Sequence, residues 1–94
     1  MSKFTTKFSE KTSNAWCNNP EYNKMLIKSR IVYLEDVMKI HGVLILKEAL
    51  DAFGINIRGI SIDILTRYWI DGGIDISYVD LGYNEYELIF KTDN

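Results

Sequence analysis

The hydrophobic period of the chain changes at Gly54, and this change restricts the fold more than any other feature. Before Gly54, apolar residues recur every three to four positions, which is the spacing of amphipathic helices. After Gly54, apolar and polar residues alternate, as they do in strands with one buried face. The sequence therefore predicts an α+β domain in which two N-terminal helices cover one face of a three-stranded antiparallel meander.

The first predicted helix spans residues 20–41. Asn19 is a favoured N-cap, Pro20 is favoured at the first helical position, and Gly42 is a favoured residue just after a helix. At 100° per residue, one half of this helix is apolar. Its apolar half consists of Tyr22, Leu26, Ile27, Ile31, Tyr33, Leu34, Val37 and Met38.

Four residues break this pattern. Asn23 and Arg30 lie within the apolar half of the helix, whereas Met25 and Val32 lie on its polar side. A snorkelling arginine and two ordinary exposed apolar residues would account for the exceptions. The alternative is that Met25 and Val32 begin a seam that binds a partner.

Two further segments flank this helix in the prediction. Residues 43–53 carry a second amphipathic stripe, which predicts a shorter helix that ends at Gly54. Residues 1–15 are polar and have no clear period, which predicts a mobile or loosely docked N-terminal arm. Phe4 and Phe8 are four apart, so one helical turn packed on the domain is the alternative. The single domain is therefore expected to cover residues 16–94.

Three strands are predicted after Gly54, separated by two glycine-containing turns. The strands are 60–70, 74–78 and 86–91, and the turns are Asp71-Gly72-Gly73 and Gly82-Tyr83-Asn84. Glycine and asparagine accept the positive φ that tight hairpin turns require. A short helix capped by Ser61 competes with the strand over residues 61–66, and the sequence leaves this alternative open.

Size and charge limit the class of protein. The chain has 94 residues, of which 47% are hydrophobic and 26% are charged, and this is the composition of one globular domain. Its formal net charge is −2. Residues 1–19 carry +2, whereas residues 54–94 have three basic and seven acidic side chains and carry −4. Direct binding of DNA or RNA is disfavoured, because nucleic-acid binders usually show a basic face.

The sequence holds few groups for catalysis or metal binding. With one cysteine, Cys17, and one histidine, His41, neither a zinc site nor a nucleophile activated by histidine is expected. His41 is better explained as a favourable charge at a helix C-terminus. Glycine-rich phosphate loops and EF-hand spacing are absent from the sequence. We therefore expect neither enzymatic activity nor a cofactor or metal.

Nothing in the sequence indicates a membrane or an oxidising compartment. No apolar run approaches the length of a membrane span, and the lysine-containing N-terminal segment lacks the apolar region of a secretory signal. A single cysteine fits a reducing cytosol. The expected location is therefore cytoplasmic.

Binding through the protein surface is the remaining expectation. Aromatic residues are enriched at the centres of interfaces, and the predicted meander carries several of them beside acidic residues. The candidate contact residues are Tyr68, Trp69, Asp71, Asp75, Asp80, Tyr83 and Glu85, together with Met25 and Val32 of the first helix. For Trp69 two interpretations stay open, packing under the N-terminal arm or contact with a partner.

The chain resembles a family of small uncharacterised bacteriophage and prophage proteins with an N-P-x-Y-N helical motif followed by a β-meander. The matching residues are W-C-N-N-P-E-Y-N-K-M-L at 16–26, Tyr33, Asp36, Gly42, Leu46, Glu48, Phe53-Gly54, Tyr68-Trp69 and I-S-Y-V-D-L-G at 76–82. The resemblance implies a phage origin, and hence action in the host cytoplasm. It brings no catalytic residues.

Two functions are consistent with these features. The first is a phage-encoded, anti-CRISPR-like inhibitor that contacts a host defence protein, such as a complex that processes nucleic acid. An acidic, tyrosine-rich face could dock where such a complex expects phosphate. The alternative is a phage structural or assembly protein, or a self-associating adaptor that forms a homodimer through Met25, Val32 and an unpaired strand edge.

Overall fold

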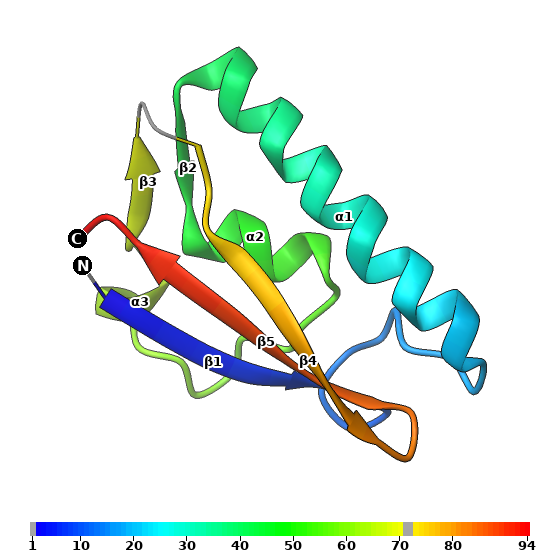
Figure 1. The fold of residues 1–94 in the computed structure, drawn as a ribbon. Helices are drawn as coiled ribbons and strands as arrows, with labels where there is room; N and C mark the ends of the chain where they lie inside the picture. The colour runs from blue at the N-terminus through cyan, green and yellow to red at the C-terminus, as the bar shows by residue number, and fades with distance from the viewer. Residues whose placement is uncertain (1, 71–72) are drawn as a thin grey trace.

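The computed structural model describes residues 2–70 and 73–94, in which helices and strands are mixed along the chain (Figure 1). The elements are β1 (Ser2–Phe8), α1 (Pro20–His41), β2 (Val43–Ile45), α2 (Leu46–Ala52), α3 (Ile62–Leu65), β3 (Tyr68–Ile70), β4 (Ile76–Gly82) and β5 (Glu85–Thr92). One sheet has the strand order β1-β5-β4, and β2 pairs with β3 in a second sheet. All pairings are antiparallel. The α+β class is confirmed, but the meander is wrong, because β1 replaces β3 in the larger sheet.

Helix α1 has the predicted boundaries, since local signals set both ends. The Asn19 side chain accepts a hydrogen bond from the Tyr22 backbone N–H at 3.1 Å. Gly42 adopts a left-handed φ of 76°, and its N–H donates to the carbonyl of Met38. Although α1 has 22 residues, neither it nor any other helix in the described residues is long and apolar enough to cross a membrane.

The predicted mobile arm is wrong for Ser2–Phe8, which form the edge strand β1. This strand pairs with β5 over its whole length, from Ser2 opposite Thr92 to Phe8 opposite Tyr86. Phe8 is completely buried. Polar residues alternate with Phe4, Thr6 and Phe8, so the period of two was present, but half of the inward positions are short or polar and the pattern is weak.

The second predicted helix begins three residues later than expected. Val43–Ile45 form β2, and α2 starts at Leu46. Two of the three residues of β2 are β-branched, which favours a strand, and the pairing with β3 supplies the hydrogen bonds. Glu48 then accepts a hydrogen bond from the backbone N–H of Ile45 at 3.3 Å and so marks the start of α2.

Of the predicted strand over 60–70, residues 68–70 form the strand β3, and residues 62–65 form the helix α3. Ser61 caps the short helix α3, which confirms the alternative that the sequence left open. The remaining strand, β3, does not pair with β4, so the predicted hairpin between them is wrong. Its turn falls on Asp71 and Gly72, which lie outside the described residues. The other edge of β3 is bonded instead by the C-terminus, because Asp93 N–H donates to the carbonyl of Tyr68 at 2.9 Å.

The hydrophobic core lies between the three-stranded sheet and the helices. One face of β5 is fully buried, and Phe90 makes an edge contact with Phe53, just after α2, at a centroid distance of 6.0 Å. The buried apolar residues are Phe8, Leu26, Ile27, Leu34, Met38, Leu44, Leu46, Ala49, Leu50, Phe53, Ile55, Trp69, Tyr86, Leu88 and Phe90. Because β1 and β5 both contribute, the core is closed by the two ends of the chain.

We expect Phe8→Ala to lower the free energy of unfolding by about 3–4 kcal/mol, because a completely buried ring is removed from the core. Urea unfolding followed by far-UV circular dichroism measures this. Lys7→Ala, at the adjacent exposed position, is the control and should change stability by at most about 0.5 kcal/mol. Equal, small effects of both substitutions would show that β1 is not part of the folded domain.

Candidate functional site

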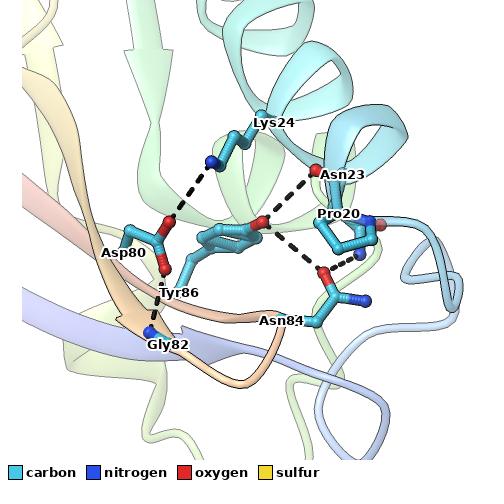
Figure 2. A network of polar contacts seen from close by, with 7 residues as sticks. All are labelled: Pro20, Asn23, Lys24, Asp80, Gly82, Asn84 and Tyr86. Atoms are coloured by element: carbon cyan, nitrogen blue, oxygen red, sulfur yellow. Dashed lines mark hydrogen bonds and ion pairs between the residues drawn. The ribbon is translucent and has the colours of Figure 1, made fainter.

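The β4–β5 hairpin ends in a two-residue turn, Tyr83-Asn84, next to the N-terminal end of α1 (Figures 1 and 2). The φ angles of Tyr83 and Asn84 are 54° and 59°. Positive φ at both central residues is the pattern of a type I′ turn, which matches the twist of the flanking strands. Asparagine tolerates this conformation, whereas a tyrosine is strained in it. The Tyr83 side chain is also 100% exposed.

A buried amide, Asn23 of α1, connects the helix to this turn (Figure 2). Its Nδ2 donates to the carbonyl of Cys17 at 2.7 Å and to Oδ1 of Asn84 at 2.8 Å. Its Oδ1 accepts from the backbone N–H of Cys17 at 3.1 Å. Asn23 is completely buried, so these three bonds replace the water that the amide loses on folding. They tie the loop, the helix and the hairpin together.

Two aromatic side chains strengthen the same junction. Trp16 Nε1 donates to the backbone carbonyl of Asn84 at 2.7 Å. The Tyr86 hydroxyl donates to the carbonyl of Pro20 at 3.3 Å and lies 3.5 Å from Oδ1 of Asn84. Burial is the main cause that raises the pKa of Tyr86, and the nearby Asp80 carboxylate raises it further. Hydrogen bonds thus hold the turn through both the backbone and the side chain of Asn84.

Asp80 links β4 to α1 at the side of this junction. One carboxylate oxygen accepts from the backbone N–H of Gly82 at 2.9 Å, and the other lies 3.4 Å from Lys24 Nζ (Figure 2). The Gly82 hydrogen bond is the main cause that lowers the pKa of Asp80, with a smaller contribution from Lys24. Both side chains of the pair are about half exposed, so it adds little stability.

The structure decides between the two interpretations of Trp69 in favour of packing. The ring is buried, with an exposure of 1%, and its Nε1 donates to the carbonyl of Lys91 at 2.6 Å. It therefore fills the core between β3 and β5 and cannot contact a partner. Tyr68 is half-buried in β3, away from the β4–β5 hairpin. Asp71 lies outside the described residues.

The predicted acidic face is dispersed. The carbonyl of Asp75 accepts from the Lys91 N–H, which places it at one end of the β4–β5 ladder, whereas Glu85 lies at the other. Six residues of β5 separate these ends, about 20 Å at the rise of a strand. Asp80 lies near the Glu85 end but is paired with Lys24. Asp80, Tyr83 and Glu85 are therefore brought together, whereas Asp75 is not.

Met25 and Val32 belong to a second exposed surface on the outer side of α1. We call it the α1 stripe, and it consists of Tyr22, Met25, Val32, Tyr33 and Ile40. Each of these side chains is between 45% and 77% exposed. At 100° per residue they fall within about 100° of the helix surface. Tyr22 and Tyr33 were predicted to face the core, but α1 turns them toward solvent.

Sequence reasoning missed Asn23, Trp16 and Asn84 as the residues that hold the site. The signal for Asn23 was visible, because an amide within the apolar half of a helix needs buried hydrogen-bond partners. Its partners, however, lie 61 positions away at Asn84 and in the loop at Cys17. Residue spacing does not reveal such a distant pair.

Within residues 2–70 and 73–94, no three His, Cys, Asp or Glu side chains come together in a way that could hold a metal ion. A polar hollow of about 340 Å³ lies between the loop after β1 and the end of α2, lined by Glu10, Lys11, Thr12, Ser13, Asn14, Gly54 and Asn56.

Comparisons of the chain with protein-family models, curated proteins and solved structures found no match. Any proposal for the function therefore rests on the geometry of the hairpin and of the α1 stripe.

We expect Asn23→Ala to lower the free energy of unfolding by about 2–3 kcal/mol, because the Cys17 backbone groups and Asn84 lose buried partners. Chemical denaturation measures the effect. Asn18→Ala is the matched control, since Asn18 is an exposed asparagine in the same loop. Amide protons around Tyr83 should also exchange faster in Asn23→Ala than in the control.

The raised pKa of Tyr86 predicts a loss of stability in alkali. The folded protein holds the phenol proton more tightly than the unfolded chain, whose tyrosine titrates near the model value of 10.0. The resulting stabilisation is present below that pH and is lost as pH rises through the raised pKa.

Tyr86→Phe cannot ionise at this position, so its stability should fall less than that of the wild type between about pH 8 and about pH 11. Urea midpoints at both pH values test this. Tyr78→Phe, on the ring that packs edge-on against Tyr86 at 6.2 Å, should keep the wild-type decline. An identical decline in all three proteins would contradict the assignment.

Proposed function

We propose that the chain is a protein-binding module and that the tip of the β4–β5 hairpin is its contact surface. The observation that carries this proposal is Tyr83, a fully exposed aromatic residue in a left-handed conformation, on a turn that buried hydrogen bonds hold in place. Glycine or asparagine would suit this position better if stability alone mattered. Backbone strain is typically kept where it serves a site.

The hairpin has properties that favour binding. A tyrosine buries a large area on contact and loses little entropy, because it has few rotatable bonds. The fixed turn lowers the conformational entropy that is lost on binding. Val79 and Leu81 are exposed on the outer face of β4 and extend the apolar area toward Tyr83. Glu85 follows the turn and places a half-buried carboxylate beside Tyr83.

The proposed partner is a host protein, and the proposed effect is inhibition of a defence complex that processes nucleic acid. Three features support this: the resemblance to bacteriophage proteins, the small size of the chain, and the carboxylates of Asp80 and Glu85 near the turn, which suit a basic surface. The mode of action is contact rather than catalysis or direct nucleic-acid binding. The corresponding location is the host cytoplasm.

The α1 stripe favours a second candidate function, that of a self-associating adaptor or phage assembly protein. Five large apolar side chains on one exposed helix face are more than the scattered exposure of an ordinary surface. The stripe and the hairpin tip are different surfaces, so the two candidates can be tested separately.

Tyr83→Asn should separate binding from stability. Relief of the strained φ is expected to raise the free energy of unfolding by about 1 kcal/mol, whereas loss of the ring should weaken partner binding. Thermal unfolding gives the first quantity. Capture of the tagged protein from a bacterial host lysate, followed by titration of the recovered partner, gives the second.

Tyr83→Phe is the matched control, because it keeps the ring and the strain and should keep most of the affinity. A Tyr83→Asn protein that is more stable and binds its partner as tightly as the wild type would overturn the proposal for the hairpin.

A further inference from the structure

We infer that the α1 stripe binds a second copy of this chain, with the two α1 helices packed side by side and antiparallel. This inference deepens the second candidate function and does not depend on the hairpin. Its occupant follows from two features of α1, the shape of its outer surface and the order of its charges.

The outer side of α1 has a hollow that the Val32 side chain of a second copy can fill. A shallow hollow of about 570 Å³ lies on the outer side of α1, lined by Glu21, Lys24, Met25, Lys28, Ser29 and Val32. Ser29 is the small residue of this group, and it lies between the exposed side chains of Met25 and Val32 along the helix. A gap of this kind between larger side chains is where the side chain of a facing helix packs.

An antiparallel arrangement brings Val32 to this hollow. The midpoint of α1, Pro20–His41, lies between Arg30 and Ile31. In a centred antiparallel pair, residues equally far from the midpoint on opposite sides face each other. Ser29 of one copy therefore faces Val32 of the other. The two-fold axis repeats the contact, so both hollows are filled by the same pairing.

The same register brings the ends of the stripe together. Tyr22 of one copy and Ile40 of the other differ by one residue in their distance from the midpoint, about 1.5 Å along the axis. Both lie at the same angle on the helix surface and both are exposed. Apolar contacts therefore form at both ends of the helix pair as well as at its centre.

The charges along one edge of the stripe favour this orientation over the parallel one. Lys28 and Glu35 lie on the same edge, and an antiparallel pair places Lys28 of one copy about 3 Å along the axis from Glu35 of the other. A parallel pair would instead place this edge of one helix beside the opposite edge of the other, so Lys28 and Glu35 would not meet. In the described part of the chain, the two ion pairs are Lys24–Asp80 and Lys47–Asp51, and neither involves these two residues.

Asp36 weakens the expected association. It lies within the stripe, at the position that faces Met25 of the second copy, where a carboxylate loses water without gaining a partner. Contacts confined to one helix face also bury less than the roughly 1,200 Å² of the smaller stable interfaces. The pair is therefore weak, with dimers expected at about 0.1 mM and above.

Sedimentation equilibrium of the full chain from about 0.01 to about 1 mM at low salt tests the inference. The mean mass of the wild type should rise with concentration toward that of a dimer. Lys28→Glu should raise the concentration for half-association about tenfold, because each ion pair becomes a repulsion. Glu35→Lys should do the same, and the double variant Lys28→Glu/Glu35→Lys should restore the wild-type curve. Asp36→Leu should tighten the association.

Two controls separate this test from folding and from the hairpin. Far-UV circular dichroism and urea midpoints should be the same for the charge variants and the wild type, since both positions are exposed. Tyr83→Asn should leave the mass unchanged. A wild type that stays monomeric at about 1 mM, or a double variant that fails to recover association, would overturn the inference. If the mean mass depends on concentration in the same way in the wild type and in all three charge variants, the antiparallel register is wrong.

Discussion

The buried side chain of Asn23 is the interaction on which the arrangement of helix and hairpin depends. Apolar packing alone is not directional, so it fixes the position of α1 less sharply than a hydrogen bond does. Asn23 supplies directional contacts, because its amide donates to Asn84 and to Cys17 and accepts from Cys17. A misplaced helix would leave this amide buried without partners, which is strongly unfavourable.

The larger sheet places a second constraint on the molecule, since its central strand comes last in the sequence. β5 lies between β1 and β4, so the first and last strands of the chain are direct neighbours. The contacts that close the core are therefore long-range, and the N-terminal segment has no partner until β5 is present. The C-terminal residue Asn94 also reaches β3, where its side chain accepts from the Tyr68 N–H at 3.0 Å. Both termini act as structural elements.

Features encoded by neighbouring residues could be predicted from the sequence, and features that need distant partners could not. Asn19 and Gly42 defined both ends of α1, and Gly82-Tyr83-Asn84 defined the hairpin, because caps and turns are set within a few residues. The pairing of β1 with β5 and of β2 with β3 joins segments that no local pattern connects. The role of Trp69 stayed open for the same reason, since the backbone carbonyl that its ring needs belongs to Lys91.

The candidate site shows the same difference between features set by neighbouring residues and features set by distant ones. Exposure of Met25, Val32 and Tyr83 could be inferred from helical angles and from the turn, whereas the dispersal of the acidic residues depends on strand register. Asp75 and Glu85 are ten positions apart, and only the β4–β5 pairing places them at opposite ends of one ladder. Within the described residues, Asp75, Asp80 and Glu85 are thus spread along the ladder and do not gather at one place.

The two exposed surfaces are compatible with each other because α1 organises both. Its first turn holds the hairpin through Asn23 and Lys24, while the stripe lies on the opposite, solvent-facing side of the same helix. An antiparallel pair of α1 helices, each about 33 Å long, would place the two hairpins near opposite ends of the dimer. Each Tyr83 would then stay exposed, and one dimer could contact two copies of a partner. For a weakly binding tip, such bivalence raises the overall affinity without any new contact, provided that the spacing of the partner sites matches that of the two tips.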